Sequence, residues 1–189
     1  MENAFNFHLT NSGPLSQACM RLGLISFKTV CNHIKQLPYG RNSDRSDFTL
    51  ILKESKGTCS TKHAFLKQIA IENEQEQVKL CLGIYKMNEK NTKGIDHVLK
   101  MNKLSYIPEA HTYLKVGNKI VDVTRTIDSE TSFVSSLLVE EQISPKQIGS
   151  YKVDFHKMYL RQWIAIKAIP HTFDSIWDIR ESCIKALNQ

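Results

Sequence analysis

Three residues have the side-chain types that a cysteine nucleophile requires, and they occur in a suitable order: Cys59, His111 and Asp122. Such an enzyme needs a thiol that ionises, a histidine that accepts and delivers a proton, and a third group that orients the histidine. We therefore expect Cys59 to be the nucleophile, His111 the general base and acid, and Asp122 the orienting carboxylate. No cofactor and no metal is required by this chemistry.

The sequence around Cys59 predicts that the thiol lies in the first turn of a helix. Gly57 fits a turn, Thr58 fits an N-cap, and an amphipathic run from Ser60 to Glu74 follows. The first amides of a helix lack partners and the helix dipole is positive there, so a thiolate is favoured and its pKa falls. This position would make Cys59 more reactive than an ordinary cysteine.

The segment from His111 to Thr124 predicts a β-hairpin. Gly117-Asn118 is a two-residue turn signal between two runs rich in β-branched residues. A loop of this length pairs Val116 with Lys119, and this pairing fixes the register of the whole hairpin.

In that register, His111 and Asp122 point to the same face as diagonal neighbours. Their Cα atoms would lie about 7–8 Å apart, within reach of an imidazole and a carboxylate. Apolar residues beside Asp122 would partly desolvate the carboxylate, which then requires a partner. The opposite face would carry an apolar layer of Thr112, Leu114, Val116, Val121 and Val123.

Other residues are candidates for substrate or oxyanion contacts. Tyr39 and Arg41 lie in a polar loop upstream of Cys59, where Tyr39 could donate to an oxyanion and Arg41 could bind an anionic group; simple packing and a pair with Asp44 are the alternatives. Ser60 follows the cysteine directly. His63, four residues after Cys59, would line the pocket or fill the interface between helix and sheet, and we do not expect zinc there because no second cysteine has ligand spacing.

Two further sets of residues have structural interpretations. Glu109 is expected to be a solvated charge at the strand entry or a residue at the rim of the site. The four remaining cysteines lie on apolar stripes and are expected in the core: Cys19, Cys31, Cys81 and Cys183.

Composition sets the wider expectations. The 189 residues are 41% hydrophobic and 23% charged, which fits a globular protein of one domain. The formal charge of +6 is spread along the chain without an aromatic-rich basic motif, so we expect a solvated basic surface and no nucleic-acid partner. Five cysteines without a CxxC pair, no signal peptide and no apolar stretch of membrane length predict a cytoplasmic protein without a membrane partner.

Periodicity predicts the remaining elements. We expect a strand over Val78–Met87, and strand or short helix over Ile95–Met101. The expected helices are Leu15–Leu37 with a kink near Gly23, Phe133–Glu141, Tyr151–Ile169 with Phe155, Tyr159, Trp163, Ile166 and Ile169 on one side, and a last helix after Thr172.

These motifs together resemble the transglutaminase-like superfamily. The resemblance rests on Gly57-Thr58-Cys59 opening a helix, His111-Thr112-Tyr113 on a strand, and the run from Ile120 to Thr124. It covers roughly residues 50–125, and it implies a papain-like core in which Cys59, His111 and Asp122 form the triad. Many members carry an aromatic residue where this chain has Ser60, and often tryptophan where it has Tyr113, which argues against protein cross-linking. The glycine- and arginine-rich motif of arylamine acetyltransferases is absent.

We therefore expect one α+β domain over residues 1–189, with a transglutaminase-like core at about 38–125. The nucleophile helix would pack on an antiparallel sheet, with helices flanking it on the N- and C-terminal sides. The expected reaction is hydrolysis of an amide or peptide-type bond through a thioacyl intermediate, on an amide- or acyl-bearing substrate such as a peptide or protein. The alternative is a non-catalytic binding module that keeps the fold.

Overall fold

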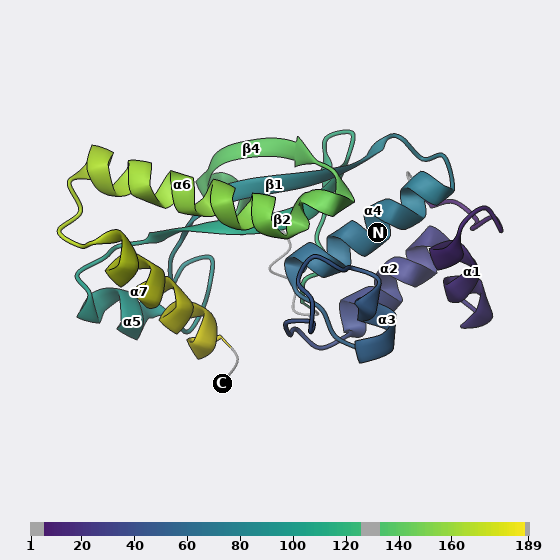
Figure 1. Ribbon diagram of the computed structural model, residues 1–189, viewed down its shortest axis with the longest axis horizontal. Helices are drawn as coiled ribbons and strands as arrows, with labels where there is room; N and C mark the ends of the chain where they lie inside the picture. Colours follow the sequence, from purple (N-terminus) through teal and green to yellow (C-terminus); the bar gives the residue numbers. More distant parts are fainter. Residues whose placement is uncertain (1–5, 126–132, 188–189) are drawn as a thin grey trace. The chain divides into compact units, whose positions relative to one another are not determined.

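The computed structural model describes residues 6–125 and 133–187. Within these ranges the chain forms seven α-helices and a four-stranded antiparallel sheet, which confirms the predicted α+β class (Figure 1). The helices are α1 (Pro14–Arg21), α2 (Phe27–Gln36), α3 (Leu50–Glu54), α4 (Cys59–Glu72), α5 (Asp96–Met101), α6 (Ser150–Lys167) and α7 (Phe173–Ala186). The strands are β1 (Val78–Met87), β2 (Ile107–Val116), β3 (Lys119–Val121) and β4 (Leu137–Ile143), and two short 3-10 helices are η2 (Val134–Ser136) and η3 (Pro145–Ile148).

The β2–β3 hairpin has the predicted register. Val116 pairs with Lys119, and Leu114 pairs with Val121, in antiparallel orientation. Gly117 has φ = 57°, the left-handed conformation that a two-residue hairpin turn requires at its first position. Because β3 ends at Val121, Asp122 follows the strand rather than lying within it.

The chain divides into two compact units, and each is described by itself. Unit 1 contains residues 1–82, 112–130 and 141–150, and unit 2 contains residues 83–111, 131–140 and 151–189. Strands β1, β2 and β4 contribute residues to both units. The single domain expected from the sequence stays a prediction.

Helix α4 is the centre of unit 1. It packs against α1, α2, α3 and η3. Every residue from Cys59 to Leu66 is buried, so the helix is enclosed on all sides along its first two turns. The surrounding core includes fully buried Phe27, Ile34, Ile51, Phe65 and Ile69. A helix buried all round must find partners inside the protein for each of its polar groups.

The helix predicted over Leu15–Leu37 is two helices, so the expected kink is a complete break. Gly23, with φ = 76°, donates its N–H to Met20 O, and the N–H of Leu24 reaches Cys19 O. These two bonds form a Schellman motif that ends α1. A new helix then begins at the N-cap Ser26, whose N–H donates to Thr29 Oγ1 at 3.1 Å.

The prediction of a helix over Phe133–Glu141 is also wrong. Only Val134–Ser136 is helical, and Leu137–Ile143 forms strand β4. The strand lies beside β1, whose other neighbour is β2. The hydrogen bonds that β4 gains from the open edge of β1 outweigh the local preference of the segment, as is common for strands.

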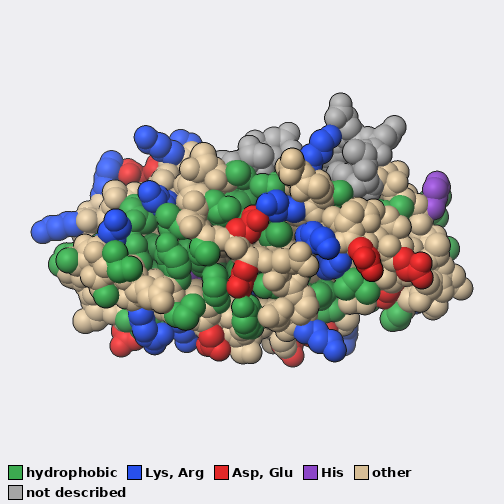
Figure 2. Space-filling view, turned by 90° about the horizontal axis from the view of Figure 1, so that it is seen from above, with side chains coloured by type: hydrophobic (Ala, Val, Ile, Leu, Met, Phe, Trp, Pro, Cys, Tyr) green, Lys and Arg blue, Asp and Glu red, His purple; other side chains and the backbone are tan. Residues whose placement is uncertain are grey.

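In unit 2, α6 buries a different side from the one expected. Its buried residues are His156, Leu160 and Trp163, whereas Ile166 is 78% exposed. His156 is held inward because its Nε2 lies 2.9 Å from Pro108 O and its ring contacts Trp177. Figure 2 shows hydrophobic side chains gathered on the left of the face in view, the side on which Figure 1 draws α6.

Unit 2 also contains a buried ion pair. The Arg180 guanidinium of α7 donates to Glu109 Oε2 from Nε at 2.7 Å and to Oε1 from its second nitrogen. Glu109 is 6% exposed, so it is neither a solvated charge nor a rim residue. Burial alone would raise the pKa of Glu109, but the Arg180 charge and hydrogen bonds lower it below the usual glutamate value. The pair fixes α7 to β2.

Replacing Gly57 with alanine should destabilise unit 1. An added Cβ would lie 2.9 Å from both Ile51 Cδ1 and Thr61 Oγ1, and neither atom has room to retreat in the core. We expect the free energy of unfolding to fall by about 1–3 kcal/mol. Urea unfolding followed by circular dichroism measures the change. Gly40→Ala is the control, because its Cβ meets the flexible Lys56 side chain at 3.2 Å and should cost much less.

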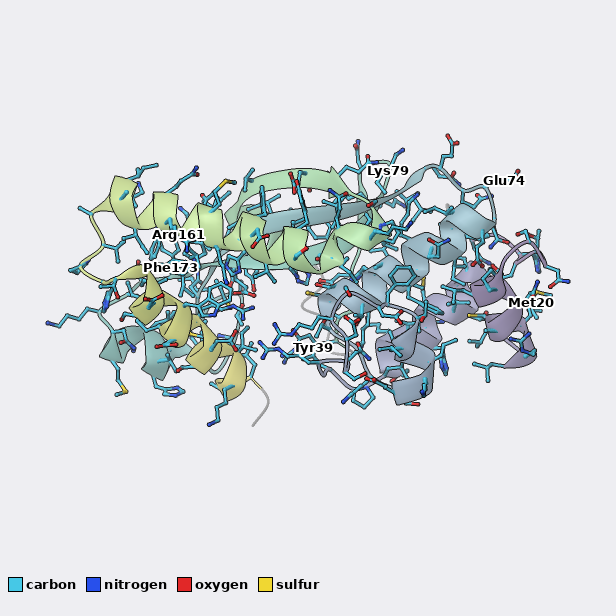
Figure 3. All side chains as sticks on the ribbon, viewed as in Figure 1. Met20, Tyr39, Glu74, Lys79, Arg161 and Phe173 are labelled. Atoms are coloured by element: carbon cyan, nitrogen blue, oxygen red, sulfur yellow. The ribbon has the colours of Figure 1, made fainter. Side chains whose placement is uncertain are left out.

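Replacing Arg180 with methionine should destabilise the protein strongly, because it leaves the Glu109 carboxylate buried without its partner. We expect a loss of about 3–5 kcal/mol in the free energy of unfolding. Adding Glu109→Gln should recover part of that loss. Arg161→Met is the control: Arg161 is exposed, and its guanidinium lies 3.9 Å from the centre of the Phe173 ring, both residues being labelled in Figure 3. Equal losses for both arginines would contradict the prediction.

Candidate functional site

Cys59 is the first residue of α4, as predicted, and Thr58 is the N-cap. The N–H of Thr58 donates to Thr61 Oγ1 at 3.0 Å, which fixes the entry of the chain into the helix. Cys59 is 7% exposed. The position lies at the positive end of the helix dipole, which favours a thiolate.

The segment before Cys59 is held by the loop that carries Tyr39. Tyr39 and Gly57 form an isolated parallel bridge, in which Gly57 N–H donates to Pro38 O at 3.1 Å and Gly40 N–H donates to Gly57 O at 3.2 Å. Figure 3 shows Tyr39 near the end of α4 where the helix begins, with Glu74 near the other end. The guanidinium of Arg125 lies 5.1 Å from the centre of the Tyr39 ring.

The remaining candidates from this region have different environments. Arg41 is exposed, in the same loop as Tyr39. Asp44 accepts hydrogen bonds from the N–H and hydroxyl of Ser46 at 2.8 and 2.6 Å, and so shapes its own turn. Ser60 is buried, with its Oγ 3.9 Å from Cys59 Sγ and 3.5 Å from Thr112 Oγ1. Of the predicted substrate contacts, Ser60 therefore lies close to the thiol, while Arg41 is exposed.

His63 connects Cys59 with the segment that carries Asp122. Its Nδ1 lies 2.7 Å from Cys59 O, and the N–H of Val123 points at its Nε2 at 2.9 Å. A carbonyl oxygen only accepts and an amide only donates, so Nδ1 carries the proton and Nε2 is the acceptor. His63 is fully buried and, with these partners, neutral. Of the two roles expected from the sequence, filling the interface fits this position better than lining a pocket.

Asp122 lies beside the same imidazole. Its Oδ1 is 3.5 Å from His63 Nε2 and accepts the N–H of Thr124 at 2.9 Å as well as the Thr124 hydroxyl. The carboxylate is 14% exposed.

Lys62 is a residue of this site that the sequence reasoning missed. The side chain is fully buried, and its Nζ donates to Leu37 O at 2.7 Å and to Thr124 O at 3.1 Å, with Lys35 O and Val123 O each at 3.4 Å. The ammonium therefore joins the end of α2, the first turn of α4 and the chain after β3. The available signal was its place three residues after Cys59, in the first turn of the predicted helix.

His111 belongs to unit 2, where it is the last residue of its segment of β2. Its ring lies 4.8 Å from that of Phe133 and 6.2 Å from that of Tyr85, both in edge-to-face geometry. Cys59 and Asp122 belong to unit 1, so the complete triad stays a prediction.

Within residues 6–125 and 133–187, no group of three or more His, Cys, Asp and Glu side chains is placed to hold a metal ion. No helix in the same part of the chain is long and apolar enough to cross a membrane.

Comparison of the chain with protein-family models, with curated proteins and with solved structures gives no match. The transglutaminase-like resemblance therefore rests on the sequence motifs alone.

The hydrogen bonds of His63 make a direct spectroscopic prediction. In ¹⁵N–¹H spectra of the imidazoles, Nδ1 of His63 should show a bonded proton and Nε2 the shift of an unprotonated nitrogen. We expect this pattern at neutral pH, because the Cys59 carbonyl only accepts and the Val123 amide only donates. His63→Asn identifies the signals. A protonated Nε2 at neutral pH would contradict the assignment.

Proposed function

We propose that this chain is a cysteine-nucleophile acyl-transfer enzyme with a transglutaminase-like core, which hydrolyses an amide or peptide-type bond. The observation that carries the proposal is the position of Cys59 at the start of the buried helix α4, where the His63 ring contacts the Cys59 carbonyl oxygen and lies 3.5 Å from Asp122 Oδ1. The first turn of α4 favours the thiolate, and the carboxylate lies in the same unit, beside that turn.

The reaction proposed for this arrangement has two halves. The Cys59 thiolate attacks the carbonyl carbon of the substrate, and the collapse of the tetrahedral adduct expels an amine that takes a proton from His111. His111 then removes a proton from water, which attacks the thioacyl group and releases a carboxylic acid and the thiolate. Asp122 keeps the imidazole of His111 oriented throughout. The N–H groups at the start of α4 are suitable donors for the oxyanion.

Three of the four other cysteines have thiols that are poorly suited to react. Burial raises the pKa of Cys19 to about 12, with a further contribution from Glu72, and raises that of Cys183 to about 11. Burial also raises the pKa of Cys31 far above the ordinary value. These three thiols are inert at neutral pH, as expected of core residues. A reactive thiol in the protein is therefore readily distinguished from them.

Alkylation by iodoacetamide tests the proposal. We expect Cys59 to be carboxamidomethylated near pH 7, faster than free cysteine, whose thiol has a pKa of about 8.5. His111→Ala should raise the pH at which Cys59 reacts, because the imidazolium that stabilises the thiolate is lost. Peptide mapping by mass spectrometry locates the adduct, and Cys31→Ala is the matched control.

Two outcomes would contradict the proposed enzymatic function. One is a Cys59 that alkylates with the pH dependence of a free thiol. The other is a profile that His111→Ala leaves unchanged. Either result would favour a non-catalytic binding module with the same fold. For the acyl step itself, an activated acyl ester should add the mass of its acyl group to the wild-type protein and not to Cys59→Ala.

A further inference from the structure

Lys62 is an unusual residue for the interior of a helix. An ammonium taken out of water costs several kcal/mol unless its environment compensates, and replacing a buried charge with an apolar side chain of similar volume is often neutral or stabilising. Four backbone carbonyls compensate Lys62 in part. None of these four oxygens carries a full negative charge, so the hydrogen-bond partners of the Lys62 ammonium are dipoles and not an anion.

The carbonyls explain why the ammonium occupies this position. Leu37 is the C-cap of α2, so its carbonyl and that of Lys35 belong to the helix end, where carbonyls lack intrahelical donors. Val123 and Thr124 follow β3, where the ladder with β2 has ended. Lys62 donates to carbonyls of both segments. Its Nζ is thereby confined between two segments that come from different parts of the chain.

This confined charge lies near the proposed nucleophile. Lys62 and Cys59 are three residues apart in α4, a spacing that makes side chains neighbours on one helix face. The ionisable groups that act on the Lys62 ammonium are Asp122, Arg125 and Cys59: Asp122 and Cys59 favour its charged form, and Arg125 opposes it. Such an interaction is reciprocal, so the ammonium favours the ionised form of Cys59.

We propose that Lys62 is a positioning residue of the Cys59 site, which holds a buried positive charge one helical turn from the thiol and so stabilises the thiolate. The inference deepens the proposed function and rests on it. The helix dipole and Lys62 then act on the same sulfur. The dipole is a property of any helix start, whereas the lysine is specific to this sequence.

The pKa of Lys62 sets the pH range of the effect. Burial is the main cause that lowers this pKa to about 8. At neutral pH the ammonium is therefore mostly charged, and its influence on Cys59 disappears as the pH rises through 8. Because the pKa in the folded state is below that of an unfolded lysine, near 10.4, the unfolded chain binds more protons between these values. The free energy of unfolding should consequently rise with pH over that interval, because fewer molecules then bury a charged Lys62 on folding.

The test compares two variants at position 62. Lys62→Gln keeps N–H donors for the carbonyls and removes the charge, whereas Lys62→Met removes both. We expect the midpoint of the pH profile for Cys59 alkylation to rise by about one unit in each variant, as for the loss of one nearby opposite charge. The matched control is Lys67→Gln, which removes a partly buried lysine from the same helix, five residues further on. It should leave the midpoint unchanged.

A second measurement covers the case in which the variants fold poorly. In the otherwise native chain, Cys59→Ser removes the negative charge at position 59, and the titration midpoint of Lys62, followed by ¹⁵N NMR of its Nζ, should fall. An alkylation midpoint that Lys62→Gln does not move, or a Lys62 midpoint that Cys59→Ser does not move, overturns the inference. If wild-type Cys59 reacts as an ordinary thiol, the proposed function fails as well. A low wild-type midpoint with no response to position 62 refutes the role of Lys62 alone.

Discussion

The buried start of α4 imposes the main constraint on unit 1. A helix end normally satisfies its polar groups with water, but the first two turns of α4 are enclosed. Two consecutive side chains of the helix meet this requirement. Lys62 donates to carbonyls at the end of α2 and after β3, and His63 accepts the N–H of Val123 while donating to Cys59 O.

One consequence is that the position of Asp122 is linked to that of Cys59. The groups after β3 that contact the helix belong to the backbones of Val123 and Thr124, and both residues lie within two positions of Asp122. Backbone contacts of this kind do not depend on the identity of the side chains that follow the strand. The carboxylate is therefore placed beside the first turn of α4 by the helix itself, even though 63 positions separate the two residues in the sequence.

The sequence predicts the local parts of this arrangement well. The N-cap Thr58, the helix start at Cys59 and the register through Gly117-Asn118 all depend on residues close together in the chain, and the structure confirms them. The prediction fails where a distant partner decides. Strand β4 forms because β1 offers an open edge. Glu109 is buried because it pairs with Arg180, which lies 71 positions further along the chain. The carbonyls that hold Lys62 come from residues 35–37 and 123–124, and no pattern within α4 could have indicated them.

The two buried charged sites differ in a way that bears on function. Glu109 and Arg180 lie in direct contact with opposite charges, so their fields largely cancel beyond the pair and their main effect is to join β2 and α7. Lys62 is hydrogen-bonded to neutral carbonyls, and the opposite charges that act on it are the proposed orienting carboxylate, which has the larger effect, and the proposed nucleophile. If this position only needed to be filled, an apolar side chain would cost less free energy to bury than a lysine. A buried positive charge at this place is instead suited to a thiolate site, because the stabilisation of an anion by a fixed cation is greatest where water is excluded.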